Sequence, residues 1–417
     1  MRIAYLTQSY PPMISGAAIL VERLAKSMAD RGHQVLVIAA SEKPCPYHSC
    51  QGNLTVMRLR STHNPLRVGQ RFLFYPRFEV LQALNQFCPD VIHTHEPLLM
   101  GRLGMEYARS LSVPILLTAH QLPWFVAKYL PNMLGIQSVV ASALWAYARR
   151  ISRQYTAVIT PSQTISDIVE RMTGIKPVTI SNGIYLKTFQ SPLPSEDHTA
   201  LKRKLHLPLD APVILHVGRL DIDKSVERVV QAAAQAMGQI EAHLLIVGDG
   251  SQKHILMKMG EKLKIADRMH FPGFIGIQDG LPEIYRLADI FVTASEIEVQ
   301  SLVLLEAIAS GLPIVAVRAS FVHEVVHPGV NGFLGVPGDI NGLADAISAL
   351  LKNPEQRDKM GKNSRMLAEE HNIQCSIVLH EQLYSRLVGQ NKVKPVLEEI
   401  STPTQWTPAN GKTEILK

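Results

Sequence analysis

Short apolar runs alternate with longer amphipathic stretches along most of the chain. In the first half, each run is followed by a helix-like stretch, and the runs are "RIAYLT", "VLVIAA", "DVIHTH", "VPILLTAH" and "AVITPS". After residue 210 the rhythm restarts with "PVILHVGR", "HLLIVGDG", "RMHFPGF", "IFVTAS", "PIVAVRA" and "GFLGVPG". Near-continuous apolar strands that alternate with helices are typical of parallel sheets covered on both faces. The pattern predicts an α/β protein with two doubly wound parallel-sheet domains.

The length of the chain also favours two domains. At 417 residues it exceeds the roughly 250–300 residues at which a single core stops growing. A Pro-, Ser- and acid-rich stretch at residues 190–200 is the expected linker between domains at 1–190 and 191–372. We expect a helix at 373–389 to pack back on the first domain, and a disordered tail without periodicity at 390–417. Because ligands bind beyond the carboxyl ends of parallel strands, the two domains are expected to enclose a cleft.

The composition of the chain excludes several classes of protein. A hydrophobic content of 46% with 19% charged residues is typical of a globular chain. Thr7 and Gln8 interrupt the first apolar run, and no segment approaches a membrane span, so a cytosolic protein is expected. The four cysteines are too scattered for a disulfide scaffold. Residues 1–190 carry 19 basic and 9 acidic side chains, and the remainder carries 23 and 27, so the excess positive charge belongs to the first half.

The stretch "EVQSLVLLEAIASGLP" contains one carboxylate, Glu306, in an otherwise apolar segment. The pattern predicts a helix with Ser301 as its N-cap and Gly311 at its C-terminal end. The free N–H groups of Leu302 and Val303, together with the helix dipole, favour an anion such as a phosphate. One turn further, Glu306 is placed to accept two hydroxyls of a bound sugar. The alternative is an ion pair between Glu306 and a neighbouring Arg or Lys.

Two further loops carry groups suited to a diphosphate. Arg219 and Lys224 in "HVGRLDIDKS" follow a predicted strand, and they offer a bidentate donor and a point charge. The alternative is a solvated basic pair. In "SYPPMISGAA", Gly16 precedes a helix expected to begin near Ala18, and it allows the backbone to approach a phosphate. The dinucleotide fingerprint GxGxxG is absent.

No metal site is expected. His93, His95 and Glu96 form a His-x-His-Glu cluster at the end of a predicted strand, but His95 and Glu96 should point to opposite faces of the sheet. The Asp-x-Asp of "LDIDK" adjoins a lysine and is expected to supply loop carboxylates. His120 ends the strand "VPILLTAH", where it is better placed to contact a substrate.

Together these motifs resemble glycosyltransferase family 4, the retaining nucleotide-sugar transferases of GT-B fold. The resemblance runs over residues 1–388 and includes, in order, "SYPPMISGAA", "HTHEP", "TAH", "TPSQ", "SNGI", "GRLDIDK", "VGDG", "YRLADIFVTAS" and the Glu-x7-Glu pair Glu298 and Glu306 followed by "AIASGLPIV". The order and joint occurrence are specific, although no single motif is. The resemblance implies two Rossmann-like domains that face each other across a cleft, the first binding the acceptor and the second the nucleotide sugar.

The resemblance also implies a role for individual residues. Glu306 would bind the nucleotide ribose, and Ile275, next to Phe274, would meet the base. The hexose would contact Glu298 and the backbone of Val299, Gln300 and Ser301. The diphosphate would be held by Gly16, Arg219, Lys224 and the N–H groups of Leu302 and Val303. His120 would lie beside the reacting sugar, so the implied catalytic set is His120, Glu298, Arg219 and Lys224.

Two positions depart from the family pattern. Ser225 replaces the usual Gly after the lysine, and "VQS" replaces the usual Phe-Gly after Glu298. The second departure bears on donor selectivity. The resemblance further implies retention through an oxocarbenium-like, front-face transition state, in which the leaving diphosphate helps to accept the proton of the acceptor. Neither a metal nor another cofactor is expected, and the nucleotide sugar is a substrate.

The acceptor is expected to be a lipid. Residues 64–78 and 144–155 interleave arginines, including Arg67, with aromatic side chains, which suits an anionic membrane surface at about 1 kcal/mol per cation. Ordinary helices with solvated arginines are the alternative. The layout of residues 93–125 is similar to the branch of the family that glycosylates diacylglycerol.

We therefore predict a glycolipid synthase that uses UDP-glucose, works peripherally at the inner face of the cell membrane and has no nucleic-acid partner. A phosphatidylinositol mannosyltransferase that uses GDP-mannose and a transferase for a soluble sugar stay open. Among proteins of other functional classes, an epimerase of GT-B fold would need additional acid and base groups in the cleft, where the sequence clearly supplies only His120. A non-catalytic nucleotide-sugar binder is disfavoured because no catalytic position is lost.

Overall fold

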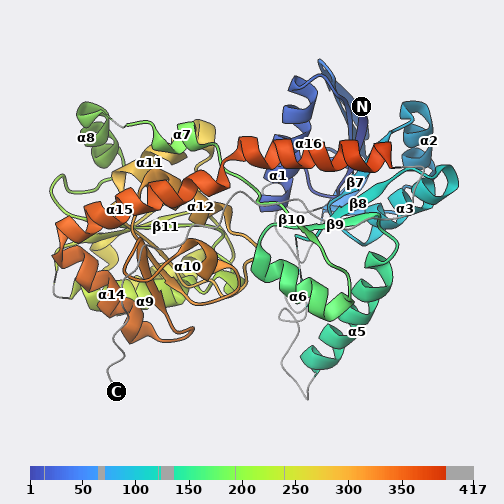
Figure 1. The fold of residues 1–417 in the computed structure, drawn as a ribbon. Coiled ribbons are helices and arrows are strands. Elements are labelled where there is room, and N and C mark those ends of the chain that lie inside the picture. Colours follow the sequence, from blue (N-terminus) through green and yellow to red (C-terminus); the bar gives the residue numbers. More distant parts are fainter. Residues whose placement is uncertain are drawn as a thin grey trace.

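The protein folds into two α/β domains that lie side by side, each with a central sheet between helices (Figure 1). The computed structural model describes residues 1–390 except 14, 64–70, 121, 124–135, 193 and 239. Arg67, the end of the 93–125 segment and the tail expected at 390–417, apart from Gln390, lie outside the described residues. The predicted α/β architecture with two parallel sheets is confirmed.

The first domain is built on an eight-stranded sheet with the order β10-β9-β8-β7-β1-β2-β4-β3. Its strands are β1 (Arg2–Leu6), β2 (Gln34–Ala40), β3 (Tyr47–Gln51), β4 (Leu54–Leu59), β7 (Val91–Thr94), β8 (Ile115–Thr118), β9 (Ala157–Thr160) and β10 (Val178–Thr179). Only β3 pairs antiparallel among these described strands. A separate hairpin joins β5 (Ser61–His63) to β6 (Arg71–Leu73). All five strands predicted for this half are present, while β3 to β6 and β10 were not predicted.

The second domain contains a fully parallel six-stranded sheet with the order β13-β12-β11-β14-β15-β16. Its strands are β11 (Val213–Val217), β12 (His243–Val247), β13 (Met269–Gly273), β14 (Ile290–Thr293), β15 (Ile314–Val317) and β16 (Gly332–Gly335). All six are predicted by the apolar runs. The side chains of β11 are buried along its whole length, which explains why this strand reads as continuously apolar.

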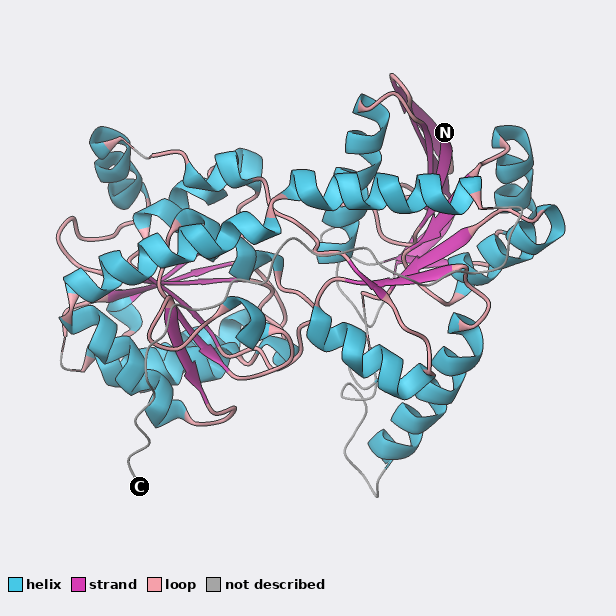
Figure 2. Ribbon diagram, in the orientation of Figure 1, coloured by secondary structure: helices cyan, strands magenta, loops and turns pink. Residues whose placement is uncertain are grey.

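Helices cover both faces of each sheet (Figure 2). In the first domain they are α1 (Gly16–Asp30), α2 (Arg77–Phe87), α3 (Leu99–Leu111), α5 (Ile136–Ser152) and α6 (Gln163–Thr173). In the second they are α7 (Leu186–Gln190), α8 (Ser195–Lys204), η1 (Ile222–Lys224), α9 (Val226–Met237), α10 (Lys253–Lys262), η2 (Ala266–Arg268), η3 (Ile277–Asp279), α11 (Leu281–Leu287), α12 (Leu302–Ser310), α13 (Val322–Val325), α14 (Ile340–Lys352), α15 (Pro354–Ala368) and η4 (Glu369–His371). Helix α1 begins at Gly16, earlier than expected, because Ser15 is extended and its hydroxyl caps the N–H of Ala18 at 3.1 Å.

The chain changes domain earlier than the expected linker at 190–200. Ile180 packs in a core cluster of the first domain, whereas Leu186 and Phe189 already pack in the core of the second. The linker stretch instead contains the start of α8, whose first turn carries Glu196 and Asp197. Acidic side chains at this position complement the helix dipole, and this explains why an acid-rich stretch forms a helix.

The chain then returns to the first domain through α16 (Ile373–Gly389), which lies across it in Figure 1. Tyr384 is fully buried there, in the same core cluster as β1 and α1. The two crossings pair with each other, since the N–H of Ile184 donates to the carbonyl of His371 at 2.8 Å and the N–H of Ile373 donates to Ile184 at 3.0 Å. Gly183 has a φ of +71°, and a Cβ there would lie 2.7 Å from the Cα of Ile373. Only glycine fits this crossing without strain.

None of the helices in the described part of the chain has both the length and the apolar character that crossing a bilayer requires.

Candidate active site

The carboxyl ends of the adjacent strands β11 and β14 bring two predicted site residues together. Lys224 follows β11, Glu298 follows β14, and the Lys224 ammonium donates to Oε1 of Glu298 at 2.6 Å. The hydroxyl of Ser295 donates to the same oxygen at 2.9 Å. Both members of the Lys224–Glu298 pair are largely shielded from solvent. The pair therefore lies at the sheet edge where ligands of parallel α/β domains bind.

Arg219 extends this pair into a row of alternating charges. Its guanidinium pairs with Asp221 and, at 2.8 Å, with Asp223, whose carboxylate lies 3.9 Å from Lys224. Asp221 and Asp223 are thus loop carboxylates that balance the cations. Among the described residues, no group of three or more His, Cys, Asp or Glu side chains could hold a metal ion. An incoming diphosphate can exchange for these carboxylates on Arg219 and Lys224.

Two helix N-termini meet beside this row. Helix α12 begins at Leu302 as predicted, and the side chain of Ser301 makes no capping hydrogen bond. The first N–H groups of the helix consequently have neither an intrahelical partner nor a side-chain cap. A Cβ built on Gly16, the first residue of α1, would lie 3.8 Å from Cδ1 of Leu302. The start of α1 therefore faces the start of α12, which favours a bound anion.

Glu306 is buried one turn into α12, with 5% of its surface exposed. Tyr285 of α11 donates a hydrogen bond to Oε2 at 3.0 Å, and Nη2 of Arg23 in α1 lies 3.9 Å from Oε1. Burial raises the pKa of Glu306 to about 7, and Arg23 and Tyr285 only partly oppose this. The alternative of an ion pair between Glu306 and a neighbouring Arg or Lys is therefore present in part, as a long contact with Arg23 of the other domain. It is not a hydrogen bond, and it leaves the carboxylate short of donors.

Sequence reasoning missed both protein partners of Glu306. Arg23 lies on the buried face of α1 among apolar residues, where burial also lowers the pKa of its guanidinium. Its spacing of seven residues from Gly16 places the two on the same helix face, and this is the signal that could have identified it. Tyr285 begins the motif "YRLADIFVTAS", but nothing local in the sequence indicates that its partner is Glu306, 21 residues away.

The segment that follows Glu298 is held against the first domain. Val299 is buried against apolar residues that include Leu122 and Trp145, and its carbonyl accepts the hydroxyl of Ser162 at 3.4 Å. The side-chain oxygen of Gln300 accepts the N–H of Asn182 at 2.7 Å. The side chains of Val299 and Gln300 therefore contact protein. Their carbonyls also accept hydrogen bonds, from Ser162 and Asn182, so the backbone N–H groups are the part of this segment left to meet a ligand.

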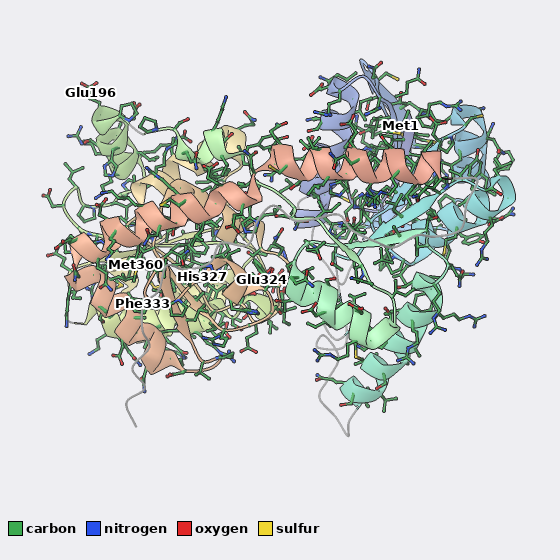
Figure 3. The ribbon with its side chains drawn as sticks, viewed as in Figure 1. Met1, Glu196, Glu324, His327, Phe333 and Met360 are labelled. Atoms are coloured by element: carbon green, nitrogen blue, oxygen red, sulfur yellow. The ribbon has the colours of Figure 1, made fainter. Side chains whose placement is uncertain are left out.

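A second contact between the domains lies close by. The carboxylate of Glu324 accepts the N–H groups of Gln163 and Thr164 at 3.1 and 2.6 Å, so it caps the N-terminus of α6 from the other domain (Figure 3). Negative charge at a helix N-terminus is stabilising. Together with Arg23 and Glu306, this contact connects the two domains and fixes their relative position in the structure.

His120 ends β8 in a buried cluster of histidines. Its Nε2 lies 2.8 Å from Nδ1 of His95, and the two rings stack with centroids 5.1 Å apart. Burial lowers the pKa of His120 to about 4, so the ring is neutral near neutral pH. Behind it, His93 contacts the hydroxyl of Tyr384 in α16 at 2.6 Å. Leu122, two residues beyond His120, packs against Val299, which places this strand end beside the loop of Glu298.

The remaining predicted donor residue comes from the loop after β13. Ile275 is half-buried and packs against the core of the second domain, while the adjacent Phe274 is exposed. The described contacts connect this loop to the second domain alone.

Two family models match the chain, Glycosyltransferase Family 4 over residues 14–188 and Glycosyl transferases group 1 over residues 197–366. Together they span both domains. The chain belongs to the family 4 glycosyltransferases. It is a nucleotide-sugar-dependent hexosyltransferase.

Curated relatives of this glycosyltransferase include a glucolipid synthase and a mannosyltransferase. Alpha-monoglucosyldiacylglycerol synthase of Acholeplasma laidlawii is 27% identical over 402 residues, which cover 94% of this chain and 99% of the relative. GDP-mannose-dependent alpha-mannosyltransferase of Mycobacterium tuberculosis is 29% identical over 387 residues, with 91% and 95% covered.

The fold of the glycosyltransferase matches solved structures over almost its whole length. Sucrose-phosphate synthase from Thermosynechococcus elongatus superposes with a TM-score of 0.77 at 24% sequence identity, covering 93% of this chain and 99% of that chain. This similarity confirms the predicted GT-B fold.

Proposed function

We propose that this glycosyltransferase moves glucose from UDP-glucose to the hydroxyl of a lipid acceptor such as diacylglycerol, with retention at the anomeric carbon. The observation that carries the proposal is the meeting of Arg219, Lys224 and Glu298 with the uncapped start of α12. This arrangement offers cations and N–H groups to a diphosphate and a carboxylate to a sugar. The relative named for monoglucosyldiacylglycerol synthesis supports the choice of glucose and of a lipid acceptor.

In this proposal the donor lies along α12. Arg219, Lys224, Gly16 and the N–H groups of Leu302 and Val303 hold the diphosphate. Glu306 accepts the ribose hydroxyls, which supply the donors that its buried carboxylate lacks. The hexose contacts the side chain of Glu298 and backbone groups between Val299 and Ser301, whereas Gln300 contributes only its backbone because its amide is engaged by Asn182. Ile275 lies against the base.

The chemistry follows from where charge develops. As the bond between the anomeric carbon and the diphosphate oxygen breaks, negative charge grows on the leaving group, and Arg219, Lys224 and the α12 dipole stabilise it. The acceptor hydroxyl attacks from the same face and gives its proton to the leaving phosphate oxygen. His120 is neutral, so it hydrogen-bonds a hexose hydroxyl without adding charge. These residues supply the electrostatic stabilisation without a metal ion or a further cofactor.

Exposed aromatic side chains support a lipid acceptor. Phe74, Tyr75 and Phe78 are 72%, 61% and 74% exposed at the start of α2, beside Arg77. Aromatic rings interleaved with cations favour the interface of an anionic bilayer. We propose that the enzyme binds the membrane peripherally through this surface.

A second candidate is mannosyl transfer from GDP-mannose, for instance to phosphatidylinositol, and the mannosyltransferase relative supports it. The two candidates differ in donor and not in the use of the site. The family match favours transfer over epimerisation.

A product assay tests the proposal. The enzyme is incubated with radiolabelled UDP-glucose or GDP-mannose and with vesicles that contain diacylglycerol or phosphatidylinositol, or with a soluble sugar. We expect labelled glucosyldiacylglycerol from UDP-glucose, and about 10²- to 10³-fold slower formation of it by the Lys224→Met variant. Label found only in a mannosyl lipid would show that the proposed donor is wrong. Label found only in a soluble oligosaccharide would show that the proposed acceptor is wrong. Epimerised donor without transfer would overturn the reaction itself.

A further inference from the structure

A second candidate binding site lies on the first domain. A cavity of about 560 Å³ is lined by residues of α3, the C-terminal half of α5 and Tyr75. Helix α3 leads into the amino end of β8, and Gln154 lies in the turn that enters β9. The cavity therefore runs along α3, from Arg102 in its first turn toward the amino ends of these strands, whereas the donor site is at the carboxyl ends of its own sheet.

The cavity has an excess of positive charge. Arg102, Arg109 and Arg150 line it, and Arg109 donates to the neutral side-chain oxygen of Gln154 at 2.6 Å. Glu106 is its one lining carboxylate, and it is already engaged by the guanidinium of Arg77, with Nε 3.1 Å from Oε2. Within the described part of the chain, Arg102 and Arg150 form no ion pair. Three guanidinium groups thus remain without a carboxylate of their own.

Guanidinium groups in this number suit a phosphate. Each can bind phosphate oxygens in a bidentate manner, which a solvated lysine cannot match. The volume exceeds that of a bare phosphate and is in the range of sites that hold a small polar molecule. A phosphate group with an attached glycerol or similar polyol therefore fits both the charge and the size.

The surroundings indicate where the phosphate comes from. Tyr75 lines the cavity and is largely exposed, and the exposed rings of Phe74 and Phe78 are its neighbours in sequence. Rings that enter the interface of a bilayer would bring the arginines to the depth of the lipid headgroups.

We propose that this cavity binds the phosphate of an anionic phospholipid headgroup, separately from donor and acceptor. The inference rests on the proposed membrane-associated function for the source of the phosphate. It does not depend on which sugar is transferred.

Binding without donor or acceptor tests the proposal. Full-length protein is sedimented with vesicles of phosphatidylcholine alone or mixed with phosphatidylglycerol, and it is titrated with soluble sn-glycerol 3-phosphate by calorimetry. Two substitutions that remove cavity charge, Arg102→Gln with Arg150→Gln, are compared with a charge-matched control outside the cavity lining, Arg171→Gln with Lys176→Gln, whose side chains are exposed. Circular dichroism establishes that each variant is folded.

We expect the cavity variant to bind phosphatidylglycerol vesicles about tenfold more weakly than the parent, and the control to change less than about twofold. Replacing Arg102 and Arg150 by lysine should still weaken binding about threefold, because the charge is kept but the bidentate hydrogen bonds are lost. Equal loss in the cavity and control variants, or full binding by the lysine variant, would overturn the proposal in favour of diffuse attraction. Cavity-dependent binding of glycerol phosphate without any dependence on vesicles would refute the lipid source. Since neither nucleotide sugar nor diacylglycerol is present, these results are independent of the transfer reaction.

Discussion

Glu306 makes donor binding depend on pH. Burial raises the pKa of this carboxyl to about 7, and ribose hydroxyls can donate only to its free lone pairs. Binding of the donor therefore favours the ionised form of Glu306 and lowers the pKa of its carboxyl. Below the pKa of the free enzyme, the proton must first be removed, which costs about 1.4 kcal/mol for each pH unit. Donor affinity should rise with pH, by about tenfold between about pH 6 and about pH 8, and then level off.

Calorimetry measures this effect directly. A nucleotide sugar is suitable because its diphosphate diester does not titrate in this range, whereas a free nucleotide diphosphate does. Titrations in two buffers with different ionisation enthalpies would report close to one proton released per donor bound at about pH 6. The Glu306→Gln variant should bind weakly and with no dependence on pH.

Glu96 provides the matched control. Among the described residues it is the other carboxyl whose pKa burial raises to about 7, and it lies in the first domain, two residues beyond β7. The Glu96→Gln variant should keep the parental pH profile. A flat profile in the parent, or the same slope in Glu306→Gln as in the parent, would refute a ribose contact by Glu306.

Three further predictions concern single side chains. Lys224→Met should lower kcat by about 10²- to 10³-fold in steady-state kinetics with a smaller change in KM, because the ammonium is needed most when charge grows on the leaving group; a change confined to KM would contradict this role. Gly183→Ala should destabilise the protein by about 2 kcal/mol more than Gly32→Ala in thermal unfolding, since both have positive φ but only Gly183 meets backbone atoms of Ile373; equal losses would show that the crossing is not tightly packed. Glu324→Gln should cost about 1 kcal/mol in the same assay, through the lost charge at the start of α6, and an unchanged unfolding midpoint would refute the cap.

Local patterns predicted the elements that carry the site. The helix from Leu302 to Ser310 is bounded by Ser301 and Gly311 as expected, because caps and apolar runs are written in neighbouring residues. Edge strands such as β3 were missed, since their exposed side chains follow no apolar run. The Pro-, Ser- and acid-rich composition predicts a linker where α8 begins, although Pro194 followed by acidic residues is also a helix-start signal.

The partners of the site residues could not be predicted from the sequence. Arg23 reaches Glu306 over a separation of 283 positions, and His93 meets Tyr384 over 291. Such contacts arise only when the two domains pack and α16 returns. The sequence showed which groups had unusual environments, but it carried no information on what they would face.

The paired crossings at Ile184 and Ile373 limit how the molecule can open. A single connecting segment would let one lobe twist and drift relative to the other, whereas two segments tied by backbone hydrogen bonds leave a short axis about which the lobes can swing. When the two domains close again, each returns to the same position relative to the other. A protein cut before residue 373 would lose one of the two segments together with the side chains that α16 adds to the core of the first domain, so both the axis and that core would be weakened.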